Sequence, residues 1–222
     1  MLHALLRRLS QGAAELLSIP LRGKNRPYID LSIHNPEGGP QLADRAELWR
    51  FIGKQYLQHR SPILWGGYLE KRASYAQSAH FGKGEQARDQ HLGIDFWAAE
   101  GTEVFAPIAG KVHSFADNSG FSNYGPTIIL KHEFEGLRFH TLYGHLSRAS
   151  LEGLEAGLPL QLGQRIAALG NDQENGGWPP HLHFQIVFDL QTWVGDYPGV
   201  CREADLPYYM GNCPDPGLLV FD

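Results

Sequence analysis

The chain has 222 residues, of which 42% are hydrophobic and 19% are charged, a composition typical of an ordinary globular protein. Its net charge of -5 offers no basic surface for nucleic acid, so we exclude nucleic acid as a partner. No apolar run reaches the about 18 residues of a membrane span, so we expect none.

The first 20 residues carry a helical pattern of apolar residues. Apolar side chains recur at helical spacing at Leu2, Leu6, Leu9, Ala13 and Leu16. Polar residues and Gly12 interrupt the apolar run that follows Arg7 and Arg8, whereas a secretory signal needs that run unbroken. We weigh an amphipathic helix docked on its own domain, a helix that binds a partner, and a poor targeting sequence. The pattern favours the docked helix.

A second helix is predicted to begin after Asp44, which has the side chain of a typical N-cap residue. Leu48, Ile52 and Tyr56, together with Trp49, are predicted to form one apolar face of this helix. We expect this face to cover one end of a sheet.

From about residue 64 onward the pattern changes to short β-rich runs separated by glycine and proline. The predicted strands are residues 93–97, 104–105, 111–116, 127–132, 138–143, 165–169 and 181–189. Such short strands, in a chain with 26 Gly and 14 Pro, favour antiparallel hairpins over βαβ units. We therefore predict a mainly β fold with a small helical N-terminal part, divided into a helical extension (1–65) and a β-rich domain (66–222).

Two short runs contain residue types that bind zinc: residues 91–95 (HLGID) and 181–183 (HLH). On a strand, His181 and His183 point to the same face about 6.6 Å apart, so both can address one site. His91 and Asp95 would lie about 13 Å apart on a straight strand, too far to share one metal. The chain is therefore predicted to bend at Gly93, where a bend costs least.

Residues 143–146 (YGHL) lie between these two runs and add a further histidine. On one continuous strand Thr141, Tyr143 and His145 would share a face, whereas His140 would point to the other face. This parity selects His145 over His140 as a site residue.

These motifs resemble those of the M23 family of zinc endopeptidases, the lysostaphin/LytM-like peptidases, which read H-x-x-x-D, aromatic-G-H and H-x-H in this order. The resemblance covers about residues 85–190 and includes residues 101–107 (GTEVFAP) and 162–167 (LGQRIA), which are similar to hairpins that flank the motifs of the family. It implies that zinc is bound by His91, Asp95 and His183. It also implies that His145 and His181 are catalytic histidines that do not bind the metal.

One segment departs from the usual family pattern. Residues 175–180 (NGGWPP) precede the H-x-H motif where the family usually has S-T-G or similar. With residues 124–127 (YGPT) and 195–199 (GDYPG), this segment resembles M23-like modules of larger proteins that also contain kinase-like and class III aminotransferase-like domains. The narrower resemblance favours a short peptide or a small amide as the substrate, with peptidoglycan as the other possibility.

The predicted reaction is hydrolysis of an amide bond by a zinc-activated water. Imidazole titrates near neutral pH, so His145 and His181 are both suited to act as the general base, and the sequence does not choose between them. Tyr143 is predicted to donate to the oxyanion or to orient a histidine. The predicted activity is that of a zinc metallopeptidase.

Two alternatives belong to other classes of protein. A cupin also carries H-x-H in a β-barrel, but there the pair precedes its other ligands, whereas here it comes last. A non-catalytic M23-like module that binds or regulates a partner would be expected to lack ligands or catalytic histidines. Because this chain keeps all of them, the enzyme is favoured.

The chain contains only two cysteines, Cys201 and Cys213, which is too few for a secreted disulfide scaffold. The pair could form a bridge if their loops meet, but we expect free thiols in a reducing compartment. Together with the interrupted N-terminal run, this predicts a cytoplasmic protein.

Overall fold

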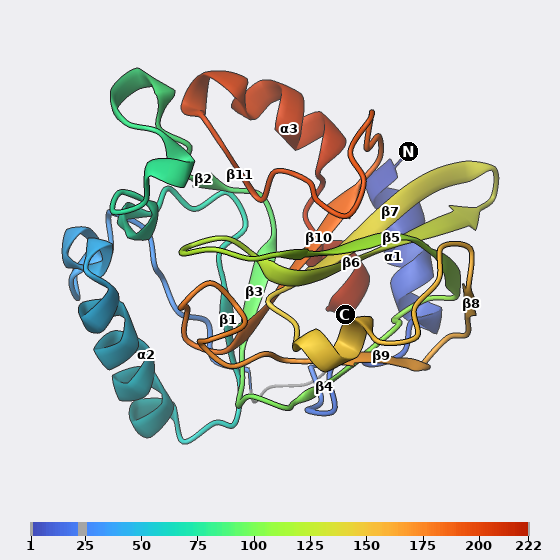
Figure 1. Cartoon of the computed structure of the whole chain (residues 1–222), viewed down its shortest axis with the longest axis horizontal. Coiled ribbons are helices and arrows are strands. Elements are labelled where there is room, and N and C mark those ends of the chain that lie inside the picture. Colours follow the sequence, from blue (N-terminus) through green and yellow to red (C-terminus); the bar gives the residue numbers. More distant parts are fainter. Residues whose placement is uncertain (1, 22–25, 222) are drawn as a thin grey trace.

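The computed structural model describes residues 2–21 and 26–221 and is built around a seven-stranded antiparallel sheet (Figure 1). In spatial order its strands are β1 (Leu64–Gly66), β3 (Ile94–Trp97), β10 (His181–Val187), β7 (Leu137–Gly144), β6 (Gly125–Phe134), β5 (Gly110–Asn118) and β8 (Pro159–Leu160). Two small sheets pair β2 (Gln90–His91) with β11 (Val200–Cys201) and β4 (Glu103–Phe105) with β9 (Arg165–Ala168). The predicted mainly β, antiparallel fold is confirmed.

The helices are short and lie around this sheet. The α-helices are α1 (Leu2–Gly12), α2 (Arg45–His59), α3 (Leu206–Asn212) and α4 (Gly217–Val220). The 3-10 helices are η1 (Gly39–Ala43), η2 (Ala73–Tyr75), η3 (Ala79–Phe81), η4 (Gly84–Gln86), η5 (Arg148–Leu151) and η6 (Glu203–Asp205). In the part of the chain that the structure describes, no helix is long and apolar enough to cross a membrane.

The two faces of the sheet have different characters, and strand β10 shows the division. Phe184 and Ile186 point into the largest hydrophobic core, whereas His183 and Gln185 point to the opposite face. All four side chains are at most 2% exposed, so both faces of this central strand are covered. A strand covered on both faces can carry buried polar groups on one of them.

The N-terminal segment docks on its own chain, as predicted. Leu6 and Leu9 of α1 are buried in the largest core, and α1 packs against α4. The helix ends at Gly12, yet Leu16 and Leu17 remain buried, because the following segment runs along β4 as an extra edge, with a bridge between Leu17 and Val104. Residues on both sides of position 65 therefore share one core. The side chain of Leu2 lies outside the described residues.

Helix α2 lies on the side of the molecule opposite α1 (Figure 1). The carboxylate of Asp44 accepts hydrogen bonds from two backbone N–H groups of the first turn, so its predicted N-cap role is confirmed. Leu48, Phe51 and Ile52 are buried. The placement of Trp49 on this face is wrong: it is 39% exposed, because it lies one residue, or about 100° of helix rotation, beyond Leu48.

Candidate metal centre

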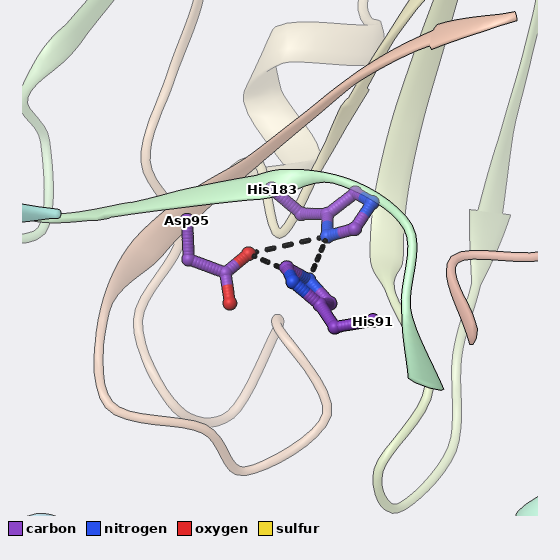
Figure 2. Close-up of side chains that lie close together, drawn as sticks. All are labelled: His91, Asp95 and His183. Atoms are coloured by element: carbon purple, nitrogen blue, oxygen red, sulfur yellow. Dashed lines mark hydrogen bonds and ion pairs between the residues drawn. The ribbon is translucent and has the colours of Figure 1, made fainter. Parts of the chain in front are cut away.

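Three side chains from three strands meet on the face of the sheet opposite the largest core: His91 of β2, Asp95 of β3 and His183 of β10. Figure 2 shows two ring nitrogens and one carboxylate oxygen facing one another. His91 Nε2 lies 2.9 Å from His183 Nδ1 and 3.3 Å from Asp95 Oδ1, and His183 Nδ1 lies 3.1 Å from Asp95 Oδ1. Each residue is at most 2% exposed.

Local backbone structure explains how distant residues reach one point. Strands β3 and β10 are neighbours, and their register places His183 directly opposite Asp95. Strand β2 ends at His91 and β3 begins at Ile94, so the chain bends at Gly93, as predicted. A Cβ on Gly93 would lie 2.6 Å from Cε1 of the His183 ring, so only glycine allows this close approach.

Hydrogen bonds on the outer side fix the direction of both imidazole rings. Nδ1 of His91 donates to the carbonyl oxygen of Gly67 at 2.7 Å, and Nε2 of His183 donates to Oε1 of Gln185 at 2.9 Å. The amide of Gln185 is itself held, because its Nε2 donates to the carbonyl oxygen of Pro198 at 3.2 Å. Each ring therefore carries its proton outward and presents a lone pair inward.

The second oxygen of Asp95 is bound by a buried arginine. Nη1 of Arg72 donates to Asp95 Oδ2 at 2.5 Å, and Nε of Arg72 donates to Glu70 Oε2 at 2.8 Å. Tyr28 in turn donates to Glu70 Oε1 at 2.8 Å. Burial alone would raise the pKa of Asp95, but the nearby His91 and Arg72 hold it well below its usual range. Asp95 is thus ionised and its remaining oxygen faces the two histidines.

The donor set fits a zinc ion. Three lone pairs that converge within 2.9–3.3 Å repel one another unless a cation lies between them. Zinc bound tetrahedrally at about 2.0–2.1 Å places its ligand atoms about 3.3 Å apart, which matches this spacing. Two histidines and one carboxylate are a ligand set that leaves a fourth position open for chemistry.

Two further histidines lie beside this cluster. Nδ1 of His145 donates to the carbonyl oxygen of Asn175 at 3.0 Å, and Nδ1 of His181 donates to that of Pro179 at 2.7 Å. Their ring centroids are 4.1 Å apart, and Nε2 of His181 lies 3.9 Å from Asp95 Oδ1. Burial is the main cause that lowers the pKa of both rings, to about 4 for His181. Both rings are therefore neutral at pH 7, each with an unprotonated Nε2.

Tyr143 does not join this group, and the expectation that it shares a face with His145 is wrong. Tyr143 pairs with Phe184 across β7 and β10 and lies in the hydrophobic core, where its hydroxyl accepts a hydrogen bond from Thr141 at 3.0 Å. Strand β7 ends at Gly144, and His145 has a φ of 64°, in the left-handed region. Because the strand has ended, its alternation no longer applies, and His145 turns toward His181 and His183 on the face opposite the largest core.

A different tyrosine borders the cluster. The Tyr124 hydroxyl lies 3.3 Å from Nε2 of His183, and the Tyr124 ring centroid lies 5.4 Å from that of His145. Tyr124 precedes β6 and begins the run 124–127 that contributes to the narrower resemblance, but this run does not indicate a contact with the histidines. Arg72, Glu70 and Gln185 also escaped the sequence analysis, because their roles depend on contacts between segments distant in sequence.

Three other histidines and the two cysteines lie outside the cluster. His113 and His140 contact each other on a different part of the sheet, with ring centroids 5.1 Å apart. His80 borders the cavity that opens from the cluster. Cys201 and Cys213 are buried free thiols, and burial raises the pKa of each to about 12.

The chain is similar to known peptidases over part of its length. Residues 89–193 match the model of peptidase family M23. A Haemophilus influenzae protein described as an uncharacterized metalloprotease is 37% identical over 96 residues, which are 43% of this chain and 18% of that protein. A solved zinc-containing peptidase from Vibrio cholerae is 27% identical, covering 44% of this chain and 27% of that one, with a TM-score of 0.36. The catalytic domain of the antimicrobial peptidase lysostaphin from Staphylococcus simulans is 26% identical, covering 55% of this chain and 80% of that one, also with a TM-score of 0.36.

Proposed function

We propose that the protein, whose residues 89–193 match the model of peptidase family M23, is a zinc-dependent peptidase that hydrolyses an amide bond. The observation that carries this proposal is the convergence of three inward lone pairs, on His91, Asp95 and His183, next to two neutral histidines. These three residues would hold the metal. When bound, zinc supplies Lewis acidity to the scissile carbonyl and lowers the pKa of a water molecule.

The chain's own residues then have separate tasks. His145 and His181 each keep the proton on Nδ1 through a backbone carbonyl, so Nε2 is free to accept a proton from the attacking water. His181 lies nearer to the ligand atoms, 3.9 Å from Asp95 Oδ1, which favours it as the first acceptor. The Tyr124 hydroxyl lies 3.3 Å from Nε2 of His183, whereas Tyr143 lies in the core, and this supports Tyr124 rather than Tyr143 as the donor to the carbonyl oxygen of the substrate.

We propose a short peptide or a small amide as the substrate, with peptidoglycan as the alternative. Trp178 and Pro179 line the cavity next to His181, where they fill space and stiffen the wall. A wall of this kind suits a small substrate better than a polymer. The cytoplasmic location and the division of the chain at residue 65 stay predictions.

The second candidate function is a non-catalytic zinc module that regulates a partner. It requires no acid–base groups next to the metal, whereas two histidines are held there with defined tautomers. The enzyme is therefore the better supported of the two.

Hydrolysis assays on the zinc-loaded full chain test the proposal. Short peptides and peptidoglycan are incubated with the wild type and with His145→Ala, His181→Ala and, as the control outside the cluster, His140→Ala. Loss of a general acid–base group typically costs about 10²- to 10⁴-fold in rate. We expect such losses for the first two variants and near wild-type rates for His140→Ala. A zinc-loaded protein that hydrolyses none of these substrates would support the non-catalytic alternative.

A further inference from the structure

The cavity that opens from the metal cluster is small and its walls are rich in aromatic side chains. Its volume is about 250 Å³, below the about 300–1,000 Å³ of sites that enclose a drug-sized ligand. One or two residues of a peptide would fill it. The aromatic residues that line it, besides Tyr124, are Tyr75, Phe81, Trp97, Trp178, Trp193 and Tyr197.

These aromatic walls are held in place by contacts behind them. The ring of Tyr75 packs edge-to-face against Phe81 and Trp178, with centroid distances of 4.8 and 5.9 Å. The guanidinium of Arg45 lies 3.4 Å from the centroid of the Trp178 ring, and its Nη2 donates to Ser122 Oγ at 2.8 Å. The cavity is therefore formed before a ligand enters, which lowers the entropic cost of binding.

The charged groups that line the cavity have partners of different kinds. Arg72 is shared between Glu70 and Asp95, as described above. At the outer part of the cavity, Arg88 donates to the carbonyl oxygen of His80, and Asp196 accepts from the backbone N–H of Tyr197. Among the described residues, Nη2 of Arg72 has no hydrogen-bond partner, and neither Arg88 nor Asp196 forms an ion pair, so the charges of the lining do not by themselves exclude a lysine or glutamate side chain. Burial of such a side chain against the aromatic walls, away from these charged groups, would be costly.

Resting on the proposed function, we infer the substrate class: a short peptide or small amide whose residue next to the scissile bond carries an aromatic or large aliphatic side chain. Such a side chain would bury its apolar surface against Phe81 and Trp193 while the adjacent amide reaches the metal cluster. An aromatic side chain would add edge-to-face contacts. A glycine would leave the cavity unfilled, and a charged side chain would be desolvated.

The test is a panel of blocked peptides, acetyl-Gly-Xaa-Gly-amide with Xaa as Phe, Leu, Gly, Lys or Glu, given to the zinc-loaded full chain. Products are measured by mass spectrometry. We expect kcat/KM for the Phe peptide to exceed that for the Gly and Lys peptides by about tenfold or more. Equal or faster cleavage of the Gly or Lys peptide overturns the inference but leaves the proposed hydrolysis intact.

A matched pair of variants tests whether the preference for Phe over Gly arises in the cavity. Trp193 is 41% exposed and lines the cavity, whereas Trp49 is 39% exposed on α2 and does not line it. Trp193→Ala should lower the preference for Phe over Gly by about two- to tenfold, the range for one aromatic pair, while Trp49→Ala should leave it unchanged. Equal effects of the two substitutions contradict the assignment of the cavity.

If no peptide is hydrolysed, calorimetry with acetyl-phenylalanine-amide, acetyl-glycine-amide and acetyl-lysine-amide decides the matter. Selective binding of the phenylalanine compound would support the inferred site while refuting the catalytic proposal. Absence of any selectivity would refute the inferred site.

Discussion

Replacing Arg72 by Met should show how far the stability and the zinc affinity of the metal cluster depend on the positive charge of Arg72. Arg72 is 4% exposed and forms ion pairs with two carboxylates, Glu70 at 2.8 Å and Asp95 at 2.5 Å. Both carboxylates are at most 8% exposed. Methionine conserves much of the volume but leaves two buried negative charges without their shared cation.

The size of the expected loss of stability follows from the burial of Arg72 and its two carboxylate partners. Breaking a buried ion pair by removing one partner costs about 3–5 kcal/mol, a large share of the about 5–15 kcal/mol that stabilises a typical domain. We expect a loss of this size in the metal-free protein. In the zinc-loaded protein the loss should be smaller, because the metal compensates the charge of Asp95. Zinc affinity should fall by about 10- to 100-fold, as for other partners behind a ligand.

Urea unfolding at pH 7, followed by circular dichroism with chelator or with zinc, measures this loss. The control is Lys71→Met, because Lys71 pairs with Glu203 at 2.7 Å on the surface, where a pair contributes about 1 kcal/mol or less. The double variant Arg72→Met/Glu70→Leu should recover part of the stability, since one unpaired carboxylate is gone. If Arg72→Met costs no more than Lys71→Met, the reasoning about buried charge is refuted.

Three other substitutions test separate parts of the account. Gly93→Ala should weaken zinc binding, measured by chelator competition, because the new Cβ would meet the His183 ring at 2.6 Å. The control Gly53→Ala, at an exposed position of α2 with no atom within 4 Å, should leave zinc binding unchanged. Equal zinc affinity of the two variants would contradict the packing argument. His132 is buried and its pKa is lowered to about 4, so as pH falls from about 6.5 to 4 the unfolded chain gains a proton that the folded chain does not, and stability is lost. Over this range, urea unfolding of His132→Gln should therefore show a loss smaller by up to about 3 kcal/mol, and a loss equal to that of the wild type would argue against the lowered pKa. Trp178→Gly should admit bulkier peptides by opening the wall beside His181, and an unchanged size range in the hydrolysis assay would show that Trp178 is no gate.

Much of the fold was predictable from local pattern, because alternation within an unbroken strand is a purely local property. Strand β10 is the best example: Leu182, Phe184 and Ile186 point into the core, and the histidines point away from it. The bend at Gly93 was predictable for a similar reason, since two ligands four residues apart cannot meet on a straight strand.

Prediction failed where the conformation is set by a distant contact or by the end of a strand. The pairing of Val200 with His91 creates the two-residue strands β2 and β11, which have too few residues to show a pattern. The left-handed turn at His145 reversed its face relative to Tyr143. Arg72 reaches Asp95 across 23 positions of the sequence, and no local pattern in either segment indicates this pair.

Zinc content after equilibrium dialysis, measured by elemental analysis, tests the central claim most directly. His181 and His183 lie two residues apart on the same face of β10, but only His183 belongs to the cluster of three inward ligand atoms. The wild type and His181→Ala should each retain about one zinc per chain, and His183→Ala should lose most of it. Wild-type zinc content in His183→Ala, or loss of zinc from His181→Ala alone, would contradict the assignment of the ligands.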